Sequence, residues 1–168
     1  MSDTFQELIN KLHHPDHNER SDAVFAIDKI AHPKKLSILI QALCTETDLY
    51  VREDITYALM NMGDIAIFPL LTLLNEDDVD IRHHAVHVLG KIGSKEGIDG
   101  LISALNDSET KVVSKAIVAL GQIGDVRAIP ALVNLLGHEN RDIQTILLDV
   151  LKRFGVHSLP FLEKAVHD

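Results

Sequence analysis

The sequence predicts an all-α fold, an α-solenoid in which helix-turn-helix repeats stack into a right-handed superhelix. Two ladders of residues keep the same interval along the chain and indicate this fold. Leucines recur every 31 residues, and each is followed four positions later by another leucine (Leu8 and Leu12, Leu39 and Leu43, Leu70 and Leu74, Leu101 and Leu105, Leu132 and Leu136). A small residue recurs at nearly the same interval (Ala31, Gly63, Gly93, Gly124, Gly155). A fixed period of this length is typical of a tandem array of one supersecondary unit.

The third repeat shows how one unit folds. Its apolar residues from Ile81 to Ile92 follow helical spacing, with one face that is suited to burial. Gly93 supplies the left-handed backbone conformation that commonly ends a helix. Ser94 is then suited to cap a second helix, whose apolar face includes Leu101 and three neighbouring aliphatic residues.

A single pair of helices cannot enclose a core, so neighbouring pairs must stack on one another. We therefore expect one domain, residues 1–168, in which residues 3–12 form a capping helix in phase with the second helices. The five predicted helix pairs are 14–44, 45–75, 76–106, 107–137 and 138–168.

The composition limits the function. Hydrophobic residues make up 46% of the chain and aromatic residues 4%, so the core must be aliphatic. The net charge of −9 disfavours binding to nucleic acid or to an anionic membrane surface. The longest apolar stretch, residues 65–74, is too short to span a bilayer. The single Cys fits a reducing compartment and residues 1–7 show no signal peptide, so we expect a soluble cytoplasmic protein.

Two repeats carry the pattern most clearly. The matching residues are Ile81-Arg82, Ala85, Leu89-Gly90 and Ile92-Gly93 in the third repeat, and Ala116, Leu120-Gly121, Ile123-Gly124-Asp125, Ala128-Ile129-Pro130 and Leu132 in the fourth. In these residues the chain resembles the short HEAT-like repeats of phycobilisome lyase subunits, over nearly its whole length. Glu19 and Ala31 depart from the pattern in the first repeat and Gln144 in the fifth, as is common in end repeats. The resemblance implies the fold, whereas such scaffolds serve unrelated functions.

In solenoids that resemble this one, the stripe of the first helix opposite its buried face lines the concave surface, where we expect a protein or peptide partner to bind. The predicted partner-binding residues are Phe25, Glu53, Asp54, Tyr57, Asn61, His83, His84, His87, Lys91, Lys115, Val118, Gln122 and Asp149. The row Phe25, Tyr57, His87 and Val118 is rich in aromatic and apolar side chains, which mark a binding groove when charges surround them. The alternative is that Phe25 and Tyr57 only cover neighbouring side-chain stems.

A histidine cluster within this stripe supports a second hypothesis. His83 and His87 lie one helical turn apart, a spacing that can hold Zn²⁺ or Fe²⁺, and His84 lies beside them. Glu53 and Asp54 occupy the equivalent positions one repeat earlier. HEAT-like deoxyhypusine hydroxylases hold iron through His-Glu pairs at these positions, but this sequence has no His-Glu pair there. Solvated surface histidines without a metal are the alternative.

The function we expect is that of a non-catalytic protein-interaction scaffold with no cofactor. A metal-binding protein or enzyme centred on His83, His87 and Glu53 is the alternative, and a bilin-lyase-like factor is a more remote one that the resemblance suggests.

Acidic runs at 46–48, 75–80 and 107–109 lie at predicted helix starts, where capping explains them. The apolar fifth repeat is compatible with a monomer or with a weak homodimer through that repeat.

Overall fold

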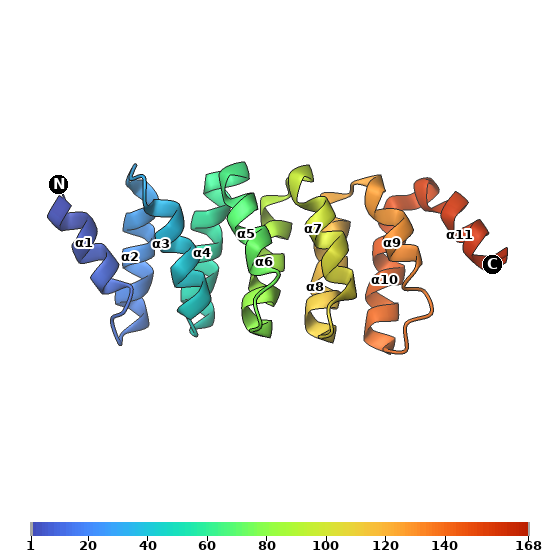
Figure 1. Cartoon of the computed structure of the whole chain (residues 1–168), viewed down its shortest axis with the longest axis horizontal. Helices are drawn as coiled ribbons and strands as arrows, with labels where there is room; N and C mark the ends of the chain where they lie inside the picture. The colour runs from blue at the N-terminus through green and yellow to red at the C-terminus, as the bar shows by residue number, and fades with distance from the viewer. Residues whose placement is uncertain (1, 168) are drawn as a thin grey trace. The chain divides into compact units, whose positions relative to one another are not determined.

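The computed structural model describes residues 2–167, and in this range the chain forms helices and no strand (Figure 1). Each predicted repeat is a long first helix followed by a shorter second helix, so the helix-turn-helix prediction is confirmed. The α-helices are α1 (Ser2–Lys11), α2 (His17–Lys29), α3 (Lys35–Thr45), α4 (Leu49–Met62), α5 (Ile67–Leu73), α6 (Val79–Ile92), α7 (Ile98–Ser103), α8 (Thr110–Ile123), α9 (Ile129–Val133), α10 (Arg141–Phe154) and α11 (Leu159–His167). The 3-10 helices are η1 (Gly63–Ala66), η2 (Lys95–Gly97), η3 (Ala104–Asn106), η4 (Val126–Ala128) and η5 (Gly155–Ser158).

The helices gather into two compact units. Unit 1 runs from Met1 to Pro69 and unit 2 from Leu70 to Asp168, so the boundary falls inside α5. In unit 1, α1 packs on α2, and both α2 and α3 contact α4. In unit 2, α6 packs beside α8 and α8 beside α10 (Figure 1). The expectation of one domain over residues 1–168 stays a prediction.

Carboxylate and amide side chains begin the first helices. Asp48 accepts hydrogen bonds from the backbone N–H groups of Tyr50 (2.9 Å) and Val51 (3.2 Å), and Asp78 accepts one from Asp80 (2.8 Å). Capping therefore explains the acidic runs at 46–48 and 75–80, as predicted. The run at 107–109 differs, because the N-cap residue of α8 makes no side-chain capping bond.

Glycines end the first helices of the third and fourth repeats. Gly93 has a φ of 71° and Gly124 a φ of 69°, the left-handed conformation that favours glycine. Their N–H groups donate to the carbonyl oxygens of Leu89 and Leu120 and thus close the last turns of α6 and α8. The predicted role of the glycine ladder is confirmed at these two positions.

The second helices are shorter than their apolar pattern suggests. Ser94 accepts a hydrogen bond from the Glu96 N–H at 3.4 Å, but it caps the 3-10 helix η2, and the α-helix begins only at Ile98. Gly97 and Gly100 both lower the helix propensity of this segment. A Cβ at Gly100 would stand 2.1 Å from the Leu71 side chain, so the glycine leaves room for its neighbour.

The core is aliphatic, as the composition predicts. The ladder leucines Leu39, Leu70, Leu101 and Leu132 are fully buried, whereas Leu8 in the capping helix is half-buried. Most apolar residues of α10 are also buried, but Leu148 remains 50% exposed. A homodimer through this last repeat stays a prediction.

One stretch of the described chain, Leu49–Leu73, is long and apolar enough, by length and composition, to cross a membrane. It is longer than the apolar run 65–74, because it joins α4, η1 and α5. Gly63 has a φ of 61° where α4 ends, so the stretch is not one regular α-helix. A single stretch of this kind is weak evidence for a membrane span, because the core helices of solenoids have the same composition.

Candidate functional site: the first-helix surface

The structure places all thirteen predicted partner-binding residues at the surface of first helices. We call this set the first-helix surface. Phe25 on α2 and four residues of α4 (Glu53, Asp54, Tyr57, Asn61) form its part in unit 1. Its part in unit 2 consists of residues from α6, α8 and α10 (His83, His84, His87, Lys91, Lys115, Val118, Gln122, Asp149). None of the thirteen side chains is buried.

Two aromatic side chains stand on a fixed platform in unit 1. Phe25 is 49% exposed and Tyr57 46% exposed, and they lie on the neighbouring helices α2 and α4. The Ser21 hydroxyl donates to the Asp54 carboxylate, and the Asn61 amide donates to Asp28 at 2.9 Å. Phe25 lies between Ser21 and Asp28 along α2, and Tyr57 lies between their partners along α4. These bonds therefore hold the two helices in register around the aromatic pair.

Asp28 organises the end of this platform. It accepts hydrogen bonds from Lys35 (2.9 Å) as well as from Asn61. Burial raises the pKa of Asp28, but the hydrogen bonds from Lys35 and Asn61 outweigh it and lower the pKa below its ordinary value. The Asn61 amide is consequently oriented by a charged acceptor on the adjacent helix.

In unit 2, contacts at two levels set the register of α6 and α8. Lys111 forms an ion pair with Asp80 near the start of both helices. Further along, a Cβ on Gly90 would stand 2.7 Å from the Cβ of Ala119, which shows how closely the helices approach. His83 on α6 and Lys115 on α8 lie between these two levels.

His83 is half-buried in a positively charged environment. Burial is the main cause that lowers the pKa of His83 to about 4, and the nearby Lys115 ammonium adds to it. The ring is therefore neutral at neutral pH. It makes an edge-to-face contact with the His84 ring, at 5.2 Å between centroids, and His84 Nδ1 lies 2.5 Å from the Asp80 carbonyl oxygen.

The metal hypothesis gains no support from this arrangement. Among the side chains that the structure describes, no group of three or more His, Cys, Asp or Glu is placed to hold a metal ion. Lys115 and Lys111 both act on His83 electrostatically, and two ammonium groups disfavour a metal cation there.

A pocket in unit 1 lies away from the first-helix surface and was not anticipated from the sequence. Its volume is about 290 Å³, and it is lined by side chains of α1, α2, α3 and α4 and of the loops that follow α1 and α3. The apolar lining consists of Ile9, Leu12, Ile38, Ala42, Val51 and Ile55, and the polar lining of His13, His14, Arg20, Gln41, Thr45, Glu46 and Thr47. One sequence signal could have indicated this pocket. The predicted capping helix, now α1, is in phase with the second helices, so it was expected to lie beside the next second helix, α3.

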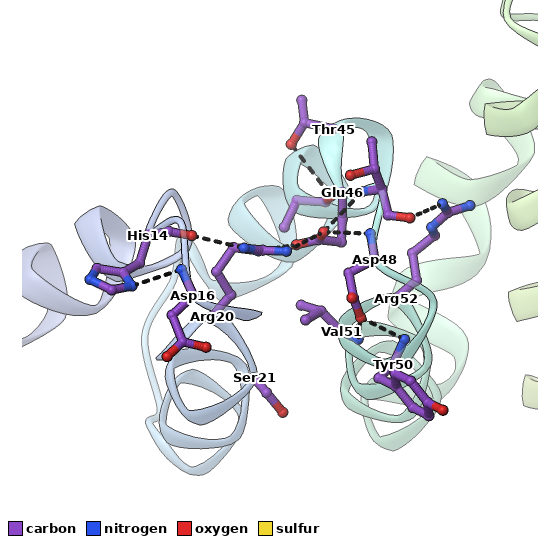
Figure 2. Close-up of polar contacts among 12 residues, drawn as sticks. His14, Asp16, Arg20, Ser21, Thr45, Glu46, Asp48, Tyr50, Val51 and Arg52 are labelled. Carbon is purple, nitrogen blue, oxygen red and sulfur yellow. Dashed lines mark hydrogen bonds and ion pairs between the residues drawn. The ribbon is translucent and has the colours of Figure 1, made fainter. Parts of the chain in front are cut away.

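The arginine of the repeat pattern is a structural link. In unit 1, Arg20 pairs with Glu46 through two hydrogen bonds of 2.8 and 3.0 Å and donates to the His14 carbonyl (Figure 2). Arg20 also donates to the Pro15 carbonyl, at 3.1 Å. The equivalent Arg82 in unit 2 pairs with Asp107 at 2.7 and 3.0 Å.

Both arginines hold the start of a first helix to the loop that follows the next helix. Arg82 completes the pattern by donating to the carbonyls of Glu76 and Asp77, both at 2.9 Å. In the fifth repeat, Gln144 donates to the His138 carbonyl at 2.6 Å and so keeps part of this link. At Arg20 and Arg82 the arginine of the repeat pattern therefore has a structural role.

These features define the class of protein: an α-solenoid of short helix pairs, with glycine-ended first helices and arginine links between loops. The family model of HEAT repeats matches residues 5–79, 67–152 and 101–168. These matches cover nearly the whole chain, so the chain belongs to the HEAT repeat family. The predicted HEAT-like repeat protein is thereby confirmed. No curated protein sequence matches it.

Solved structures share the fold. The complex of CpcE and CpcF of phycocyanin lyase from Nostoc sp. PCC7120 gives a TM-score of 0.61 at 23% identity, over 90% of this chain and 65% of that chain. Human deoxyhypusine hydroxylase in complex with glycerol gives 0.59 at 19% identity, over 92% and 63%. A designed armadillo repeat protein in complex with the peptide (KR)4 gives 0.53 at 21% identity, over 88% and 80%. The chain thus spans less than two thirds of each natural neighbour, and identities this low establish the fold alone.

Proposed function

We propose that this chain is a non-catalytic scaffold that binds a protein or peptide partner on its first-helix surface, which we take to be the concave one. The observation that carries the proposal is the pair Phe25 and Tyr57. Both rings are about half exposed on helices that hydrogen bonds hold in register. Aromatic side chains presented on a rigid platform lose little conformational entropy on binding, which makes them effective anchors.

The fold supports the same function. Stacked helix pairs present a long row of side chains from successive first helices, and this architecture is suited to extended partners. Two of the neighbouring structures are complexes, one between CpcE and CpcF and one between a designed armadillo repeat protein and a peptide. We also propose a cytoplasmic location, in keeping with the single Cys.

The test uses the tagged chain as bait in a lysate of the native host. The double variant Tyr57→Ala with His87→Ala removes one anchor from each part of the first-helix surface. Its matched control is Phe68→Ala with His157→Ala, which removes an aromatic ring and an imidazole that are exposed but lie outside this surface. We expect the test variant to capture the partner about tenfold less than wild type, since truncating an anchor weakens binding strongly.

The control variant should capture the partner as wild type does. Circular dichroism must show that both variants keep their helix content. Equal capture by the test variant and the control would contradict the proposal, because the first-helix surface would then contribute nothing to binding.

A further inference from the structure

The charge of the first-helix surface changes between the two units. Unit 2 carries ten Lys and Arg residues against fourteen Asp and Glu, a net charge of −4. Yet the seven surface residues that α6 and α8 contribute include three histidines and two lysines and no carboxylate (His83, His84, His87, Lys91, Lys115, Val118, Gln122). A local patch with two lysines and no carboxylate, on a unit of negative net charge, indicates what kind of group it can attract.

Lys115 is one of the two lysines of this patch. The α6–α8 register places it beside His83, between the Asp80–Lys111 ion pair and the contact of Gly90 with Ala119. Lys111 is already paired with Asp80. For Lys115, in contrast, no carboxylate within the described part of the chain lies at ion-pair distance.

The surroundings of Lys115 favour an incoming anion. Its side chain is half-buried, so neighbouring residues cover part of the aliphatic stem while the ammonium can still reach an incoming group. The half-buried ring of His83 is neutral and offers one N–H donor beside this charge. An ammonium and an adjacent N–H donor together match one carboxylate group.

We propose that the α6–α8 part of the first-helix surface binds an acidic segment of the partner, with an Asp or Glu carboxylate of that segment paired to Lys115 and hydrogen-bonded by His83. This inference rests on the proposed function and adds the chemistry of the partner. A nucleic acid fits less well, because binding along a phosphate backbone needs many cations and a chain of net charge −9 repels it.

The probe is a fluorescein-labelled peptide of twelve residues in which Glu alternates with Ala or Leu. Two matched peptides carry Lys or Gln in place of every Glu. Fluorescence anisotropy with the full chain should show binding of the Glu peptide that weakens as NaCl is added, and at least about tenfold weaker binding of the Lys and Gln peptides.

Two variants with the same charge change locate the site. Lys115→Met keeps the aliphatic stem and removes the ammonium, and it should weaken binding of the Glu peptide by about fivefold or more. Lys95→Met removes an exposed lysine of η2, outside the first-helix surface, and should leave the affinity unchanged. Thermal melts should show both variants folded.

Three results would overturn the inference: no binding of the Glu peptide, equal binding of the Lys or Gln peptide, or equal effects of the two variants. The proposed function and the acidic-segment inference can be tested separately. If the Tyr57→Ala, His87→Ala variant loses the native partner while Lys115→Met captures it normally, the scaffold function stands and the acidic-segment inference falls.

Discussion

Leu132 shows how much a single side chain contributes to this fold. It belongs to the leucine ladder and is fully buried in α9, the second helix of the fourth repeat. Replacing it with Asp removes about 1.5–3 kcal/mol of burial and leaves a carboxylate without a partner in the core. We expect Leu132→Asp to lower the free energy of unfolding by about 3–5 kcal/mol in urea denaturation.

The control for this change is Leu148→Asp. Leu148 is 50% exposed on α10, so the same substitution should cost less than about 1 kcal/mol there. If both variants unfold at the same urea concentration, the helix register derived from the leucine ladder is wrong.

The Arg82–Asp107 pair makes stability depend on pH. The hydrogen bond from Arg82 holds the pKa of Asp107 below its ordinary value of 3.8, against the raising effect of burial. Because the folded state favours the carboxylate, this stabilisation is complete above about pH 4 and is lost as the pH falls through the lower folded-state pKa. Acid should therefore remove the stabilisation that the Arg82–Asp107 pair provides.

Asp107→Asn tests this link. At pH 7 we expect the variant to be about 1–3 kcal/mol less stable than wild type, since a hydrogen bond to a charged group is lost. At the lowest pH at which wild type stays folded, more of Asp107 is protonated, so the difference should be smaller. Urea denaturation at the two pH values measures it, and a difference that does not change with pH would exclude this role of the pair.

At the level of single residues, sequence reasoning succeeded where partners are local. The capping roles of Asp48 and Asp78 follow from their place just before an apolar helical pattern. The partner of Arg20 is Glu46, 26 residues away, and only the packing of the repeats brings them together. The surface positions of the thirteen predicted residues were predictable from helical periodicity. That no carboxylate among the described residues pairs with Lys115 was not predictable.

At the level of elements, close helix approach limits what the first helices accept. Gly90 faces Ala119 of α8, and a Cβ added there would lie 2.7 Å from the Ala119 Cβ and 3.1 Å from its Cα. Ala normally stabilises a helix relative to Gly by about 1 kcal/mol, but here the backbone of α8 must move. We expect Gly90→Ala to destabilise the chain by about 1–3 kcal/mol, measured by urea denaturation.

Gly137 provides the comparison. An added Cβ at Gly137 meets nothing within 4 Å and no left-handed backbone conformation is required there, so Gly137→Ala should change stability by less than about 0.5 kcal/mol. A stabilising effect of Gly90→Ala would show that α6 and α8 lie further apart than the structure has them.

The first helices were more predictable than the second helices. Both ends of α6 carry local signals, an Asp at the start and a Gly at the end, and the structure begins and ends the helix there. The segment from Ser94 to Asn106 has an apolar helical pattern but forms a short α-helix between two 3-10 helices. Its glycines weaken helix propensity, and its contacts with Leu71 in the preceding repeat are not visible in a local pattern.

For the whole chain, the repeat period was the decisive signal. An interval of 31 residues implies stacked helix pairs with an aliphatic core, and neither the net charge nor the aromatic content contradicts it. The net charge of −9 gave less guidance about the binding surface. The total does not show that this surface has an aromatic and acidic part in unit 1 and a histidine and lysine part in unit 2, because it also sums charges elsewhere, such as the capping carboxylates Asp48 and Asp78.

The central claim is that a partner binds the first-helix surface, and amide hydrogen exchange of the captured complex tests it most directly. Peptides from α2, α4, α6 and α8 should exchange more slowly in the complex than in the free chain, while those from α3, α7 and α9 should exchange at unchanged rates. Protection confined to the second helices, or to the residues that line the pocket between α1 and α3, would contradict the claim.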